Sequence, residues 1–373
     1  MDTTNTKISF FEKIKKYCPK FSLVFFLMCF LAAIIHVICL ISKGFADIYN
    51  QTAGAFVRAV LAYLTMFLPF SLAETIIIGL PILLVMLIYI SIKCFKKSDT
   101  AATRCIVGLF SVLTFMYSIF VLGYGMGYHG TSLASKLELE EKAVTAEELK
   151  ETAEILLEEM TPLLDEITFF EEGQSYMPYK LNEMNGKLND TYIESNQKYP
   201  FIQKIRTRLK YIVLSEPMTY THISGVYSYY TGEANLNINF PDYTLPFTAA
   251  HELAHQRGIA PENEANFVAF LICTESNDSY IRYSGYLNMF EYVTNALYTA
   301  NPEMYYEVIL KLDSRARGEM VAYSRFFEKY RESVASEVSD AVNDTYLKTQ
   351  GQSSGTASYG LVVDLAVAYY KEK

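Results

Sequence analysis

The chain lacks the cysteines that a disulfide-stapled domain needs. It has six cysteines in 373 residues, and all but Cys273 lie within the first 105. The larger part of the chain therefore cannot close an internal disulfide. The neighbours of Cys273 are mostly apolar, so we expect its thiol to belong to a hydrophobic core rather than to act as a nucleophile. No internal repeat is present.

Basic charge is scarce beyond residue 127. Residues 128–373 contain 21 Lys and Arg against 36 Asp and Glu, a net charge of −15. Residues 1–127 contain 11 against 5, a net charge of +6. A basic, apolar part thus precedes an acidic, polar one, and the acidic part is not expected to bind nucleic acid because it would repel phosphates.

Long apolar runs dominate the first part. Three of them lack charged side chains and are long enough to cross a hydrocarbon layer of about 30 Å as helices, at about residues 21–42, 75–92 and 105–124. A fourth stretch, 53–70, contains Arg58 and is expected to be amphipathic or re-entrant. A cleaved signal peptide is the alternative for the first run. That run is longer than the usual apolar region of a signal peptide and lacks a small-residue cleavage site.

Positive charge indicates the orientation of these spans. Five lysines precede the first run, and four basic residues separate the second from the third, at Lys93, Lys96, Lys97 and Arg104. The positive-inside rule places both groups in the cytoplasm. We therefore expect residues 1–127 to form a multi-pass membrane region with a cytoplasmic N-terminus, and residues 128–373 to form an extracytoplasmic domain.

The motif His251-Glu252-Leu253-Ala254-His255 carries the chemistry. On a helix, residues four apart share one face, so the two imidazoles can bind one metal ion while Glu252 lies beside it. Because the chain has only five histidines, the motif should arise by chance roughly 0.005 times in this composition. Pro246 and Gly258 offer a start and a stop for the helix. The pattern predicts a zinc site with Glu252 as general base.

A catalytic zinc ion usually has three protein ligands, and two glutamates compete for the third position. Glu262 would share a helix face with small or polar residues, including Asn266, and that face suits close approach to the first helix. Glu264 would lie on a packing face with Phe267 and is the alternative. The Glu262-x-x-x-Asn266 spacing resembles the Glu-x-x-x-Asp pattern of gluzincin peptidases, so Asn266 would support a ligand histidine from outside the ligand set.

The second part is expected to be mostly helical with a small sheet. Helices are predicted at about 133–160, with a capping box at Thr145 and Glu148, at 199–214, and after the metal motif at 262–275, 280–299, 302–333, 334–348 and 357–371. Two strands, Val226–Tyr230 and Ala234–Phe240, would flank a turn at Thr231-Gly232. Strands before the motif helix and a further helix after it form the zincin arrangement. The segment Gly232–Phe240 is the candidate edge strand for a peptide substrate.

The chain resembles the bacterial membrane family called domain of unknown function 3810 in the run GEANLNINFPDYTLPFTAAHELAHQRGIAPENEANFVAFLIC and in RYSGYLN after it. PFSL at 69–72 and SYGLVVDL at 358–365 fit the same family. The resemblance implies a membrane-anchored α+β protein of the bacterial cytoplasmic membrane. Three N-terminal transmembrane helices would precede a mostly helical, zincin-like metallopeptidase domain. It implies no particular substrate.

The expected reaction is hydrolysis of peptide bonds at Zn²⁺ held by His251, His255 and Glu262. Tyr283 and Tyr286 are the candidate oxyanion donors. The substrate would be a peptide, a protein or a peptidoglycan peptide. One alternative is a non-catalytic, metal-stabilised sensing or binding module on a membrane anchor. The other alternative is a protease that cuts within the bilayer. The motif lies more than 120 residues beyond the last span, which argues against this alternative because the site should then lie in water.

Overall fold

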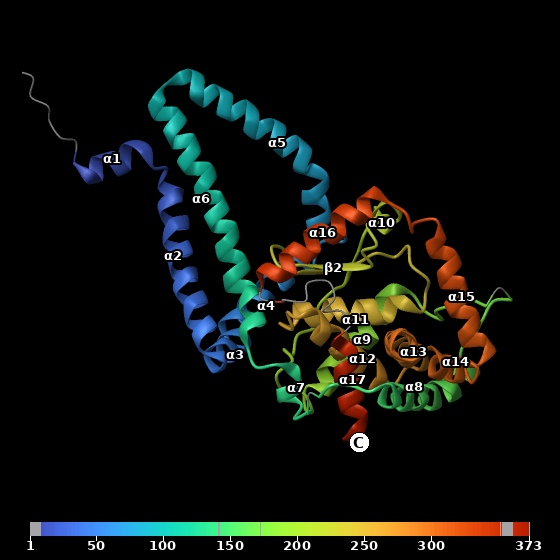
Figure 1. Cartoon of the computed structure of the whole chain (residues 1–373). Helices are drawn as coiled ribbons and strands as arrows, with labels where there is room; N and C mark the ends of the chain where they lie inside the picture. The colour runs from blue at the N-terminus through green and yellow to red at the C-terminus, as the bar shows by residue number, and fades with distance from the viewer. Residues whose placement is uncertain (1–8, 141, 172, 351, 353–360, 373) are drawn as a thin grey trace, which may run out of the picture.

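Helices make up most of the chain, both in its apolar first part and in the larger second part (Figure 1). The computed structural model describes residues 9–140, 142–171, 173–350, 352 and 361–372. The sequence also contains a glycine- and serine-rich segment at 353–358, which indicates a break between helices, and this segment lies outside the described residues.

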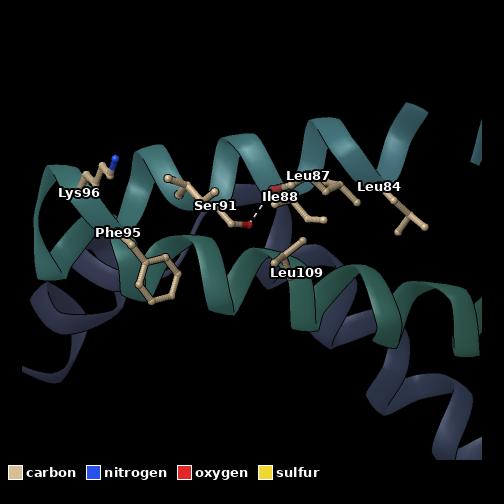
Figure 2. Close-up of a pocket in the computed structure, with 8 residues that line it drawn as sticks. Leu84, Leu87, Ile88, Ser91, Phe95, Lys96 and Leu109 are labelled. Carbon is tan, nitrogen blue, oxygen red and sulfur yellow. Dashed lines mark hydrogen bonds between the residues drawn. The ribbon is translucent and has the colours of Figure 1, made fainter. Parts of the chain in front are cut away.

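Three helices of the first part are long and apolar enough to cross a membrane: α2 (Lys20–Ile41), α5 (Leu72–Lys97) and α6 (Asp99–Gly123). They cover the three runs predicted from the sequence. A short helix, α1 (Phe10–Tyr17), precedes them. In Figure 1, α2 runs alongside α6, whereas α5 meets α6 near their connecting turn and then separates from it. Figure 2 shows the open apolar groove between α5 and α6, which is lined by residues that include Leu84, Leu87 and Phe95 of α5 and Leu109 of α6.

The fourth apolar stretch forms a short helix rather than a span. Helix α4 (Ala53–Thr65) follows α3 (Lys43–Gln51) and has 13 residues, about 20 Å of helix, which is too short to cross a bilayer. Its small and polar face, which includes Arg58, is buried against the rest of the protein. Phe56 and Leu64 on the other face are each 69% exposed, and Phe67 just beyond the helix is 80% exposed. The helix therefore turns its large apolar side chains outward.

The small sheet has three strands in the order β1-β3-β2. Strand β1 (Lys210–Tyr211) pairs in parallel with β3 (Glu233–Leu236), and β2 (Gly225–Ser228) pairs with β3 in antiparallel fashion. The prediction of an edge strand at Gly232–Phe240 is wrong, because β1 occupies the second side of β3. Strand β2 is the edge instead.

The helix predicted at 199–214 is also wrong. Buried Ile202, Ile205 and Leu209 have the spacing of a helix face, but the chain there is extended and ends in β1. Asn189 makes this possible, because its side chain accepts from the Thr207 amide (3.1 Å) and donates to the Thr207 carbonyl (3.0 Å). Asn189 belongs to α9 (Leu181–Ser195).

The predicted helix at 133–160 is interrupted. It consists of α7 (Leu133–Lys136) and α8 (Ala146–Met160), and the predicted capping box at Thr145 and Glu148 is present. After α6 the chain also forms the short helices η1 (Gly125–His129), η2 (Thr161–Glu166) and α10 (Ser215–Thr219). The later helices follow the prediction except that the stretch 302–333 is divided, and they are α12 (Glu262–Thr274), α13 (Ser279–Ala300), α14 (Pro302–Ile309), α15 (Ser314–Glu328), α16 (Val334–Thr349) and α17 (Val362–Lys371).

The core of the second part surrounds the motif helix, α11 (Thr244–Gln256). Helices α12 and α13 pack on α11, and α8, α9 and α17 enclose this group. Ala249, Ala250 and Ala254 are fully buried, and their small side chains allow this close approach. Cys273 is also fully buried in this core, as predicted.

Polar contacts join the sheet to the base of α5. The Glu233 carboxylate of β3 accepts from the backbone amides of Leu72 (3.0 Å) and Ala73 (2.9 Å), the first residues of α5. Ser71 donates to the Asn235 side chain of β3 at 2.7 Å. These groups satisfy the open N-terminus of α5, so the sheet and the membrane helix hold each other in place.

Candidate metal centre

Helix α11 places the two motif histidines together. His251 and His255 lie one turn apart, with ring centroids 4.5 Å apart, and both are buried. The helix ends at Gln256, and Gly258 follows with φ of +95°, a conformation that L side chains avoid. A sharp turn over 258–261 then leads directly into α12, whose first residue is Glu262.

This turn brings Glu262 to the two imidazoles. Its Oε2 lies 3.2 Å from His251 Nε2 and 3.4 Å from His255 Nε2. The three ligand atoms lie within 4.8 Å of one another, and among the described residues this is the group that could hold a metal ion. Two imidazole nitrogens and a carboxylate are a ligand set of catalytic zinc sites. The residues present therefore fit the ion that the sequence predicted.

Glu264, the alternative third ligand, points elsewhere. Its Oε1 accepts a hydrogen bond from the backbone amide of Leu133 at 2.8 Å, at the start of α7. The geometry thus favours Glu262.

The charges within the cluster also suit a cation. Burial alone would raise the pKa of Glu262, but His255 and His251 beside it hold that pKa far below its usual value. Burial lowers the pKa of His255, yet the Glu262 carboxylate outweighs this and raises it overall. Burial and the neighbouring His255 lower the pKa of His251. A buried carboxylate that stays ionised, next to one neutral imidazole, attracts a positive charge to this position.

Glu252 lies in the same buried space. Its side chain is 4% exposed, and burial raises its pKa to about 8. Its Oε2 has no hydrogen-bond partner among the described residues. A buried carboxylate oxygen without a hydrogen-bond partner destabilises the folded protein unless water or a substrate group donates a hydrogen bond to it. Glu252 therefore has the environment of a proton-accepting group.

Strand β2 covers Glu252 closely. A Cβ on Gly225, the first residue of β2, would lie 2.6 Å from Glu252 Oε1 and 2.7 Å from its Cγ. Only glycine leaves room for the carboxylate at this point. The free edge of the sheet thus begins directly beside the candidate general base.

His255 is supported from a distant part of the chain. Its Nδ1 lies 2.7 Å from the carbonyl oxygen of Ile259, which can only accept, so Nδ1 carries the proton and Nε2 faces the cluster. The hydroxyl oxygen of Tyr124 lies 2.9 Å from the same Nδ1, and this hydroxyl donates to the carbonyl of Ala260 at 3.3 Å. Tyr124 therefore holds both the imidazole and the turn that leads to Glu262.

Two further residues grip this turn. Asn50 of α3 donates to the carbonyl of Gly258 at 2.9 Å. Arg58 of α4 donates to the Asn50 side chain (2.8 Å) and lies where a Cβ on Gly258 would be. The sequence pattern did not indicate Tyr124, Asn50 or Arg58, since each lies more than 120 residues before the motif.

Asn266 lies beside His251. Its side chain stabilises the protonated form of His251 and is almost wholly buried. His251 Nδ1 and the Asn266 amide nitrogen have no other partner among the described residues.

The predicted oxyanion donors make other contacts. Tyr283 donates to Glu319 at 3.4 Å, and Tyr286 donates to Glu159 at 3.2 Å. The charge of Glu262 reaches two other tyrosines. After burial, it contributes to raising the pKa of Tyr292 of α13, and after burial and Tyr128 it contributes to raising that of Tyr346 of α16. With 30 tyrosines in the chain, sequence position alone could not select them.

Comparison with known proteins gives one match. The model of a family described as "Protein of unknown function (DUF3810)" matches residues 49–367, which includes α4, two of the three apolar spans and the whole metal centre. No curated protein and no solved structure matches the chain.

Proposed function

The chain belongs to the DUF3810 family, and since the description of that family assigns no activity, we propose a function from the chemistry of its site. The protein is a membrane-bound, zinc-dependent metallopeptidase that hydrolyses peptide bonds. One observation carries this proposal: His251, His255 and Glu262 converge within 4.8 Å in a buried site, next to the unpartnered carboxylate oxygen of Glu252.

Each residue of the site has a definite task in this reaction. His251, His255 and Glu262 would hold Zn²⁺, which when bound lowers the pKa of water and polarises the scissile carbonyl. Glu252 accepts a proton from the attacking water as the new C–O bond forms. It returns that proton to the amine nitrogen as the C–N bond breaks. Tyr292 and Tyr346, whose pKa values the charge of Glu262 helps to raise, are candidates to donate a hydrogen bond to the developing oxyanion.

The edge strand β2 offers a place for the substrate backbone. The Asn237 amide donates to the Ser224 carbonyl (2.9 Å), so the alternation of an antiparallel ladder turns the N–H and C=O groups of Gly225 and Tyr227 away from β3. An extended peptide that pairs with these groups passes directly over Glu252. Peptides, proteins and peptidoglycan peptides all have backbones that can pair in this way.

The charge distribution supports an orientation. The three apolar helices anchor the chain in a membrane, which we propose to be the bacterial cytoplasmic membrane. The lysines before α2 and between α5 and α6 favour a cytoplasmic N-terminus, which places the metal centre outside the cytoplasm.

The proposal is tested with the purified full chain in detergent. The zinc-loaded protein should cleave members of a randomised fluorogenic peptide pool or cross-linked peptidoglycan peptides. Glu252→Gln should keep its zinc ion and lose about 10²- to 10⁴-fold in turnover. Glu264→Gln, two residues from the third ligand, is the matched control and should retain both. A zinc-loaded wild-type chain that cleaves neither probe, or a Glu252→Gln variant as active as wild type, would instead favour the metal-stabilised sensing module.

A further inference from the structure

The metal centre lies against the outer end of a membrane helix. Helix α6 ends at Gly123, and the next residue, Tyr124, has its hydroxyl 2.9 Å from His255 Nδ1. One tyrosine side chain therefore separates the end of the span from a metal ligand. Although 127 residues separate Gly123 from His251 in the sequence, the fold brings His251 and His255 close to the end of α6.

The edge strand lies at the same level. Tyr229, just after β2, packs its ring against Phe120 with centroids 5.0 Å apart, and it stacks on Tyr124 at 5.6 Å. Phe120 lies inside α6, about 5.4 Å or one turn before Tyr124. Tyr227 of β2 also contacts the Tyr124 ring, at 5.3 Å. The hairpin of β2 and β3 thus rests on the last turn of the span.

Lipid-facing surface continues beside this hairpin. A Cβ on Gly232, in the turn between β2 and β3, would meet the backbone of Ala62 in α4 at 2.6 Å, so α4 touches the hairpin directly. On its other side, α4 exposes Phe56 and Leu64. A helix with an apolar outer face, too short to span, fits the interface of a bilayer. The base of α5 is bonded to β3 on the same side of the domain.

These contacts fix the position of the metal centre relative to the ends of the membrane helices. The end of α6, α4 and the base of α5 all contact the sheet or the ligands, which ties the site to the ends of the membrane helices (Figure 1). The sheet nevertheless follows the end of α6 rather than lying beside its middle, so the site is outside the hydrocarbon layer. A chain that runs along the membrane surface is therefore well placed to pair with β2 and reach Glu252.

We propose that the substrates of this site are membrane-anchored polypeptides, cleaved in an extended segment immediately outside the bilayer. This inference rests on the proposed peptidase function. An extended segment of five residues spans about 16 Å, enough to pair with Gly225 and Tyr227 while its anchor stays in the membrane. Peptidoglycan peptides and soluble proteins, which do not present their chains at the lipid surface, are excluded as preferred substrates.

The test uses the full chain in vesicles of phosphatidylethanolamine and phosphatidylglycerol, with randomised peptides as the probe. The peptides are attached to a lipid either directly or through a rigid helical spacer of Glu-Ala-Ala-Ala-Lys repeats, and a third arm leaves them free in solution. Both tethered arms have the same local concentration and differ only in height above the membrane. Glu252→Gln in each arm identifies cleavage by the site itself.

Directly attached peptides should be cleaved about 10-fold or more faster than spacer-raised ones, and faster still than free ones. Equal rates for the direct and raised peptides would overturn the inference while leaving the peptidase proposal in place. Absence of Glu252-dependent cleavage in all arms by zinc-loaded protein would refute the peptidase proposal, and the substrate inference with it.

Discussion

Tyr124 should set the metal affinity of the site although it is not a ligand. Its hydroxyl contacts His255 Nδ1 (2.9 Å) and the Ala260 carbonyl (3.3 Å), so Tyr124→Phe removes both contacts and keeps the ring. Loss of a partner that supports a ligand usually lowers metal affinity 10- to 100-fold. The Ile259 carbonyl, 2.7 Å from the same nitrogen, remains in the variant. We therefore expect a loss of zinc affinity at the lower end of this range, about 10-fold, which corresponds to about 1.4 kcal/mol of binding free energy.

The measurement is a competition titration of zinc against a chelator, on the full chain in detergent. Tyr49→Phe is the matched control, because its hydroxyl also comes from the membrane part and donates to a backbone carbonyl, that of Leu122 at 2.9 Å. Tyr49→Phe should lose about 1 kcal/mol of stability for its one hydrogen bond, and Tyr124→Phe up to about 2 kcal/mol for its two. Only Tyr124→Phe should lose zinc affinity and change the visible spectrum of the cobalt-substituted protein. Equal affinities for the two variants would refute the role of Tyr124.

Three other results should follow from the site and its surroundings. At the same free zinc concentration, Glu262→Gln should lose its zinc ion and Glu264→Gln should retain it. The reverse result in metal analysis would identify Glu264 as the third ligand. Gly225→Ala should displace the general base and lower turnover about 10-fold or more with zinc retained, whereas Gly186→Ala, where a Cβ meets nothing within 4 Å, should match wild type in both assays. Burial raises the pKa of Glu319 from 4.5 to about 7, so the folded chain holds a proton that the unfolded chain releases in this window. Glu319 should therefore contribute a fall in stability of up to about 3 kcal/mol as pH rises from 4.5 to 7. Thermal unfolding of Glu319→Gln should show a smaller slope than wild type by this amount, because burial also raises the pKa of Glu252 and Glu291 and their contributions remain. A slope equal to that of wild type would refute the contribution of Glu319.

The parts of this protein that depend on local pattern could be predicted from the sequence. The four-residue spacing of His251 and His255 gives a shared helix face wherever the helix lies. Glu262 was favoured over Glu264 because small residues on its face allow one helix to approach another. The apolar spans follow from length and composition alone.

Strand pairing and side-chain contacts between residues far apart in the chain could not be predicted from the sequence. Strand β1 has only two residues, and the spacing of Ile202, Ile205 and Leu209 before it imitates a helix, so β3 was taken for an edge. Tyr124 reaches His255 across 131 residues, and no periodicity records such a contact. The distance along the chain between α6 and the motif indicates only that the site is not within the bilayer, and it does not indicate that the fold returns the motif to the end of the helix.

The grip of Asn50, Arg58 and Tyr124 on the turn between α11 and α12 has a consequence for biosynthesis. Synthesis runs from the N-terminus, so these three residues leave the ribosome well before His251 and Glu262. The metal ligands are therefore synthesised after the residues that surround them have been inserted with the membrane helices. A chain that failed to insert would keep its motif but lack the surroundings that hold His255 and the Gly258 turn. Maturation of the metal centre is in this way tied to arrival at the membrane, and a newly made chain has no complete site in the cytosol.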